Sequence, residues 1–154
     1  MTSDGITQKD WGRVCRISMA IFNSIMRHND KSVENQKAKL FACLDRLEAK
    51  YGELPSIVGA RADFEDNQRK RVRLWKRAYH LAQARQDFKN VTLIASSLAD
   101  YFIDERQDKR RGRYWLKRLA EALARYDIPD ERKLMRRLSV ALRALDPKRR
   151  SRRA

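Results

Sequence analysis

Residues that favour tight turns or covalent cross-links are scarce in this chain. Its 154 residues include only five glycines, three prolines and two cysteines. So few glycines and prolines leave little material for the turns of an all-β fold, whereas abundant Ala, Leu, Arg, Lys and Glu favour helix. Because Cys15 and Cys43 are isolated in the sequence, they are typical of a reducing compartment rather than of a disulfide framework.

Long apolar runs are also missing. No stretch approaches the roughly 20 apolar residues needed to cross a bilayer, and the first five residues are polar and acidic, unlike a secretory signal. We therefore expect a cytoplasmic protein, nucleoid-associated or nuclear if its partner is nucleic acid. We expect no membrane partner, because the apolar helix faces are needed for a core.

Acidic residues are scarce in the second half of the chain. Residues 1–66 hold ten Lys/Arg and ten Asp/Glu, whereas residues 67–154 hold 26 and ten, so the whole formal charge of +16 lies there. A charge distribution this uneven indicates a partner of opposite charge. The sequence favours an acidic protein or peptide, with nucleic acid (DNA or RNA) as the alternative.

Hydrophobic spacing predicts an all-α fold. Apolar residues recur at helical intervals, and no segment alternates with a period of two over a useful length. We expect one helical domain over residues 1–146, in which an N-terminal helix precedes three helix-turn-helix hairpins at 36–66, 69–105 and 109–146. A disordered basic tail is expected at 147–154.

The N-terminal helix is expected to run from Thr7 or Lys9 to about His28. Its apolar stripe, as the spacing indicates, consists of Trp11, Val14, Cys15, Ser18, Phe22, Ile25 and Met26. Ile17 and Ile21 flank that stripe and suggest a homodimer contact.

The three hairpins resemble one another. Basic and apolar residues precede an aromatic residue at Phe41, Trp75 and Trp115, with offsets of 34 and 40 residues. This period, with an aromatic residue early in each first helix, resembles the tetratricopeptide repeat over about residues 36–146, although Tyr79 stands where that family has a small residue. The resemblance implies a right-handed stack of helical hairpins that binds a peptide or protein without catalysis. The alternative is a helical bundle whose aromatic spacing is accidental.

Basic residues gather on one side of each of three helices, opposite the apolar side. The candidate partner-binding residues are Arg69, Lys70, Arg73, Lys76, Arg77 and His80 in the first stripe, Arg110, Arg113 and Lys117 in the second, and Arg132, Arg136 and Arg143 in the third. We expect the stripes to merge into one exposed surface. Solvated faces are the alternative, but like charges without interspersed Glu repel one another, and a partner would relieve that repulsion.

Catalytic motifs are absent from the sequence. The two histidines and two cysteines lack metal-site spacing, and there is no Gly-rich phosphate loop. We therefore expect no enzymatic activity, no cofactor and no metal. A third hypothesis comes from Arg73 and His80, whose spacing resembles the active motif of HEPN ribonucleases, although Leu74 stands where that family has a polar residue. Trp75 and Trp115 are expected in the core, where they could not stack on bases.

Overall fold

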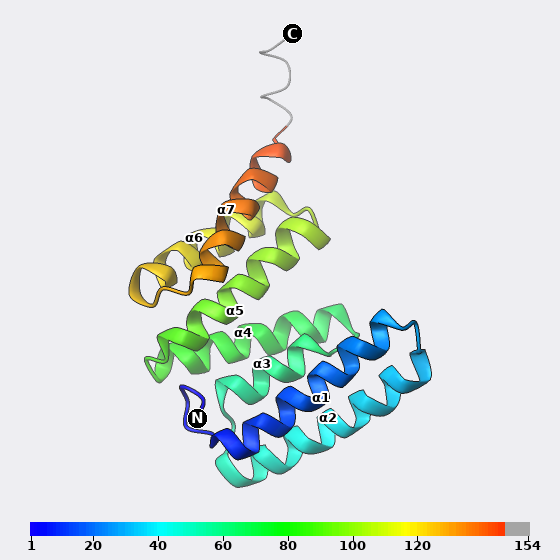
Figure 1. Ribbon diagram of the computed structural model, residues 1–154. Helices are drawn as coiled ribbons and strands as arrows, with labels where there is room; N and C mark the ends of the chain where they lie inside the picture. The colour runs from blue at the N-terminus through cyan, green and yellow to red at the C-terminus, as the bar shows by residue number, and fades with distance from the viewer. Residues whose placement is uncertain (147–154) are drawn as a thin grey trace. The chain divides into compact units, whose positions relative to one another are not determined.

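The structure is a computed structural model that describes residues 1–146 (Figure 1). These residues form seven α-helices and one π-helical turn, and none of them lies in a strand, which confirms the all-α prediction. The described residues divide into two compact units, Met1–Leu81 and 82–146. A single domain and tetratricopeptide-like stacking stay predictions, and the predicted basic tail at 147–154 lies outside the described residues.

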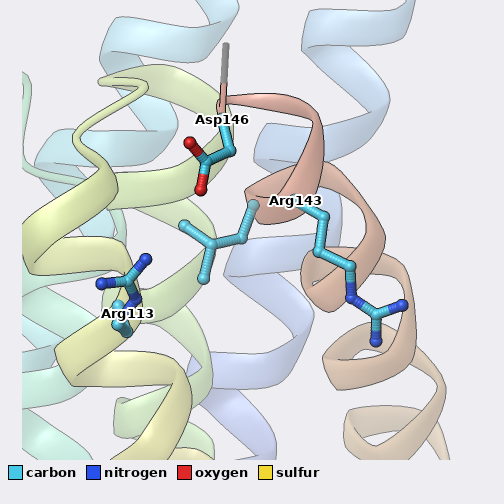
Figure 2. Close-up of a pocket in the computed structure, with 4 residues that line it drawn as sticks. Arg113, Arg143 and Asp146 are labelled. Carbon is cyan, nitrogen blue, oxygen red and sulfur yellow. The ribbon is translucent and has the colours of Figure 1, made fainter. Parts of the chain in front are cut away.

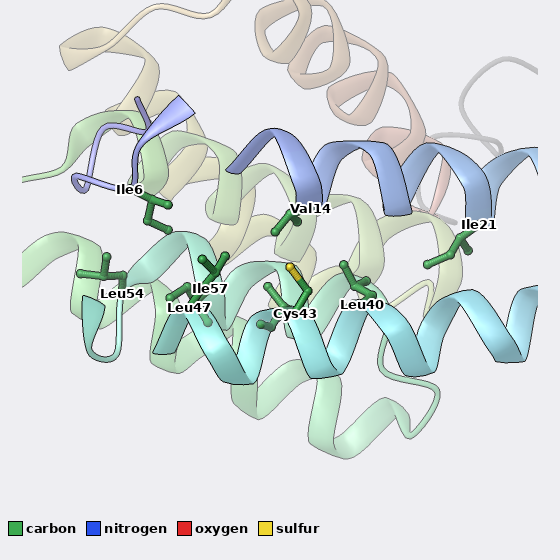
Figure 3. Close-up of a cluster of buried hydrophobic side chains, with 9 residues drawn as sticks. Ile6, Val14, Ile21, Leu40, Cys43, Leu47, Leu54 and Ile57 are labelled. Carbon is green, nitrogen blue, oxygen red and sulfur yellow. The ribbon is translucent and has the colours of Figure 1, made fainter. Parts of the chain in front are cut away.

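The first unit is built around an antiparallel helical hairpin. It contains α1 (Gln8–Met26), α2 (Asp30–Tyr51), α3 (Pro55–Asp63) and most of α4 (Gln68–Ala84). Helix α1 packs along α2, and α3 packs against α2. The core between these elements consists of Ile6, Val14, Ile21, Leu40, Cys43, Leu44, Leu47, Leu54 and Ile57 (Figure 3).

The buried side of α1 differs from the expected one. Ile21 is fully buried and points toward α2 in Figure 3, and Ile17 packs against the same core. Phe22, Ile25 and Met26, expected in the core, are 63%, 51% and 70% exposed. Apolar residues occupy more of the circumference of α1 than one neighbouring helix can cover, so packing against α2 decides which are buried. The predicted homodimer contact through Ile17 and Ile21 is therefore wrong.

The residues before α1 fasten the start of α3. Leu54, at the N-cap of α3, provides no side-chain hydrogen bond, and the cap is supplied from elsewhere. The Asp4 carboxylate accepts a hydrogen bond of 2.7 Å from the backbone N–H of Ser56. Pro55 occupies the first turn, a position that suits proline because its missing amide hydrogen would be unsatisfied there anyway.

The second unit contains three helices and a wide turn. Helix α5 (Phe88–Asp100) continues into the π-helix η1 (Tyr101–Glu105), followed by α6 (Lys109–Arg125) and α7 (Pro129–Ala144). Helix α6 packs against α5, and α7 packs against both. Trp115 is buried in this unit and Trp75 in the first, which confirms their predicted core positions.

Three interhelical turns share one construction. Each places a non-glycine residue with positive φ directly before an Asn or Asp N-cap, whose side chain accepts a hydrogen bond from the backbone N–H three residues on. The pairs are His28–Asn29, Gln86–Asp87 and Gln107–Asp108, with φ values of 52°, 55° and 50° at the first residue. The left-handed residue reverses the chain, and the cap starts the next helix.

Candidate functional site

Four of the six candidate residues on α4 form one narrow stripe. Arg69, Arg73, Lys76 and His80 are spaced by four, three and four residues, so they fall within an arc of about 60°. All four are exposed. Within residues 1–146, none of their side chains forms an ion pair or a hydrogen bond, and the His80 ring lies edge-on to Tyr79 with 5.8 Å between centroids. This stripe offers uncompensated positive charge to solvent.

The other two candidates on α4 have carboxylate partners in the first unit. Lys70 Nζ lies 2.7 Å from Glu65 Oε2, and this contact lowers the pKa of Glu65. Arg77 binds both carboxylate oxygens of Glu53 through one edge of its guanidinium, at 2.5 Å (Nε to Oε1) and 2.7 Å (Nη2 to Oε2). The charges of Lys70 and Arg77 are therefore locally balanced, and the net positive field of α4 comes from the stripe.

Helix α6 places an exposed aromatic ring among its candidate cations. Arg110, Arg113 and Lys117 are exposed, and within residues 1–146 none of them has an acidic partner. Tyr114 lies between them in the sequence and is 51% exposed. The guanidinium of Arg118 lies 5.1 Å from the Tyr114 ring centroid, a cation–π distance.

Tyr114 is a candidate that the sequence reasoning missed. It follows Arg113 directly and falls beside, not on, the stripe formed by the buried Trp115 and Leu119. That position off the apolar side of a helix is a signal visible in the sequence, and it distinguishes Tyr114 from Trp115. The ring is large, accessible and surrounded by cations.

Helix α7 contributes fewer uncompensated charges than expected. Arg136 and Arg143 are exposed, and within residues 1–146 neither has an acidic partner. Arg132 is half-buried and pairs with Asp127, with 2.8 Å between Nε and Oδ1. Arg137, which was not predicted, binds Asp100 at 2.7 Å and also Asp104, so it links α7 to the end of α5 and to η1.

A depression between α6 and α7 brings two of the predicted stripes together (Figure 2). Its volume is about 350 Å³, and its walls are Arg113, Leu142, Arg143 and Asp146. Asp146 is held by Lys109, with 2.8 Å between Nζ and Oδ2. In Figure 2 the Arg143 guanidinium points away from Arg113, so the two arginines share a surface without converging on one point.

Residues 1–146 contain no group of three or more His, Cys, Asp or Glu side chains that could hold a metal ion. Arg73 and His80 lie on the same side of α4, separated by about two helical turns, or roughly 10 Å along the helix axis.

No helix in the described part of the chain has the length and apolarity of a membrane span.

Comparisons with protein-family models, with curated proteins and with solved structures found no match. The tetratricopeptide resemblance therefore rests on the spacing of the aromatic residues alone, and the function is argued from the surface itself.

Proposed function

We propose that this chain is a non-catalytic module that binds single-stranded nucleic acid through the exposed cations of α4 and of α6–α7. Phosphate contacts would supply most of the affinity, because releasing counterions from a polyanion is favourable for any dense cluster of Lys and Arg. Six arginines and two lysines among the candidates lack acidic partners within residues 1–146: Arg69, Arg73, Lys76, Arg110, Arg113, Lys117, Arg136 and Arg143.

Tyr114 is the observation that favours nucleic acid over an acidic protein. Carboxylates pair with arginine as well as phosphates do, so the cations alone do not separate the two partners. An exposed aromatic ring bordered by Arg110, Arg113 and Lys117 gives an unpaired base a stacking surface beside the groups that bind its phosphates. Bases of a duplex are stacked on one another, so this ring favours a single strand.

Binding should be measured by fluorescence anisotropy with a labelled single-stranded RNA, the same sequence in DNA, the DNA duplex and a poly-glutamate peptide. Each probe is titrated at two salt concentrations. The single strands should bind most tightly, and their affinity should fall with a log–log slope of about −0.7 for each phosphate contact. Tight binding of poly-glutamate without binding of nucleic acid would instead support an acidic protein partner and overturn the proposal.

A charge-matched pair of triple variants tests whether the α4 stripe is the site. Replacing Arg69, Arg73 and Lys76 by Gln should weaken single-strand binding and reduce the salt slope by about 2. Replacing Lys31, Lys39 and Arg46 by Gln removes the same charge from exposed positions on α2, and should have little effect. Equal losses in both variants would show that affinity follows net charge alone.

Tyr114→Leu tests the stacking step. It should weaken single-strand binding by about 5- to 150-fold, corresponding to about 1–3 kcal/mol for one stacked base, and should leave duplex binding unchanged. Tyr114→Phe keeps the ring and should retain the affinity. Equal behaviour of the Leu and Phe variants on single strands would remove Tyr114 from the site.

The ribonuclease hypothesis is tested separately, by comparing RNA cleavage by the wild type with RNA cleavage by His80→Ala.

A further inference from the structure

Helix α1 exposes an apolar face in the half of the chain that carries no net charge. Met19, Phe22, Ile25 and Met26 are between 51% and 70% exposed, and Cys15 is exposed as well. A soluble monomer seldom exposes several large apolar side chains together on one helix. Val14 and Ile21, which already pack in the core, lie roughly 110–130° around α1 from the centre of Cys15, Met19, Phe22 and Met26, and Ile25 lies between the two sides. The exposed face is therefore available for another partner.

The spacing of this face is symmetric along the helix. Cys15, Met19, Phe22 and Met26 are separated by four, three and four residues, and they fall within an arc of about 60°. The pattern therefore reads the same in both directions about a point between Ala20 and Ile21. A twofold axis through that point brings Met26 of one helix opposite Cys15 of another, and Phe22 opposite Met19.

We infer that the α1 face is a homodimer interface in which two copies pair their α1 helices antiparallel about this twofold axis. A twofold interface requires a surface that is complementary to itself, and the symmetric spacing meets that requirement. The inference does not depend on the proposed nucleic-acid function, because none of the residues on this face belongs to the cationic stripes.

The exposed area is consistent with a weak dimer. Large apolar side chains present on the order of 200 Å² each when fully exposed. At the observed exposures, Met19, Phe22, Ile25 and Met26 offer about 500 Å² per copy, or about 1,000 Å² for the pair, and stable interfaces bury about 1,200–2,000 Å². Cys15 and the half-buried Trp11 at the edge of the face supply part of the difference.

Charge predicts how this interface responds to salt. The four residues of the symmetric stripe are uncharged, but Arg16 and Arg27 lie along one side of it and are exposed. In the antiparallel pair, Arg16 of one copy approaches Arg27 of the other. Salt screens this repulsion and the repulsion between the basic halves, so dimerisation should strengthen as salt rises. Polyanion binding responds to salt in the opposite direction.

Disulfide trapping tests the antiparallel register. Two antiparallel helices at ordinary packing distance place opposite residues within reach of a disulfide, so Met26→Cys should cross-link to Cys15 of a second copy under mild oxidation. Wild type should not cross-link through Cys15, because the two Cys15 residues of the antiparallel pair are about 16 Å apart along the helix axis. Ala42→Cys, at an exposed position on α2, controls for random oxidation. Rapid cross-linking of wild type would indicate parallel pairing and overturn the inference.

Sedimentation equilibrium of the full chain, from about 1 to 200 µM, tests the dimer without modification. We expect a concentration-dependent shift toward the dimer mass, and about a tenfold or larger rise in the dissociation constant for Phe22→Glu. A monomer over the whole range would overturn the inference. So would binding of wild type, but not of Phe22→Glu, to phosphatidylglycerol vesicles in the absence of a dimer, because α1 would then be a membrane-surface helix.

Discussion

The indole N–H of Trp75 donates a hydrogen bond of 2.8 Å to Asp63 Oδ1, joining the end of α3 to α4. Removal of the Asp63 carboxyl from water raises its pKa above the usual 3.8, while the hydrogen bond from Trp75 and the charge of Arg71 act in the opposite direction. The contact therefore orients a buried tryptophan beside a carboxyl group whose charged form is disfavoured. The folded protein binds this proton more tightly than the unfolded chain does.

The raised pKa has a defined consequence for stability. The stabilisation linked to Asp63 protonation is fully present below the unfolded pKa and is lost as pH rises through the folded value. Asp63→Asn keeps an oxygen acceptor for Trp75 but removes the charge. We expect a higher melting temperature than wild type at pH 7 and a difference that shrinks toward pH 4. Thermal unfolding by circular dichroism from pH 4 to pH 8 measures both, and a constant loss of stability across that range would contradict this assignment.

Local signals in the sequence predicted the helices well. Gly52 ends α2 with a positive φ of 79°, and Pro55 opens α3, and both residue types are typical of those positions. These signals work because each depends on one residue's own backbone preferences. The left-handed residues Gln86 and Gln107 carry no such signature, since glutamine favours no turn, and their φ values follow from the geometry that the flanking helices impose.

Longer-range features could not be read from spacing. The partner of Arg77 is Glu53, 24 residues earlier, and that of Lys70 is Glu65. A helical wheel places Lys70 and Arg77 on the predicted basic side of α4, but it contains no information about carboxylates outside that helix. The buried side of α1 was missed for a related reason, because only the neighbour in space distinguishes Ile21 from Phe22.

Adjacent residues on α1 give a direct test of which side is buried. Ile21→Ala should destabilise the first unit by about 2–5 kcal/mol, since it leaves a cavity in a fully buried position. Phe22→Ala removes a larger side chain from a 63% exposed position and should change the stability by no more than about 0.5 kcal/mol at a protein concentration that favours the monomer. Urea denaturation measures the two changes, and the reverse order would show that α1 is rotated about its axis.

The turn between η1 and α6 should accept a stabilising glycine. Gln107 has a φ of 50°, a region that costs a non-glycine residue roughly 1–2 kcal/mol. Glycine lowers the free energy of unfolding by about 0.5–1 kcal/mol, because it gives the unfolded chain more conformational freedom. On balance, Gln107→Gly should raise the free energy of unfolding by about 0.5–1 kcal/mol, or the melting temperature by a few degrees. Ala42→Gly is the control, because this exposed residue lies in the interior of α2 and its replacement should cost about 1 kcal/mol. Destabilisation by both variants would contradict the left-handed assignment.

Gly112 in α6 is the position where an added methyl group should be most harmful. A Cβ there would lie 2.6 Å from Ile103 Cγ1 in η1, so Gly112→Ala forces α6 and η1 apart, whereas Leu142 Cδ1 in α7 would be at an ordinary contact distance of 3.5 Å. We expect a loss of about 1–3 kcal/mol, typical of overpacking. Gly12→Ala in α1, whose Cβ would meet only the end of the Arg16 side chain at 3.7 Å, should instead gain about 0.5–1 kcal/mol from helix propensity.

A double-mutant cycle separates this contact from a general intolerance of α6. Ile103→Ala alone should cost about 2–5 kcal/mol as a large-to-small change at a buried position, but it also removes the atom that Gly112→Ala meets. The double variant should therefore be more stable than the sum of the two single losses by about 0.5–3 kcal/mol. Strict additivity would show that the close approach of α6 to η1 does not depend on these two residues.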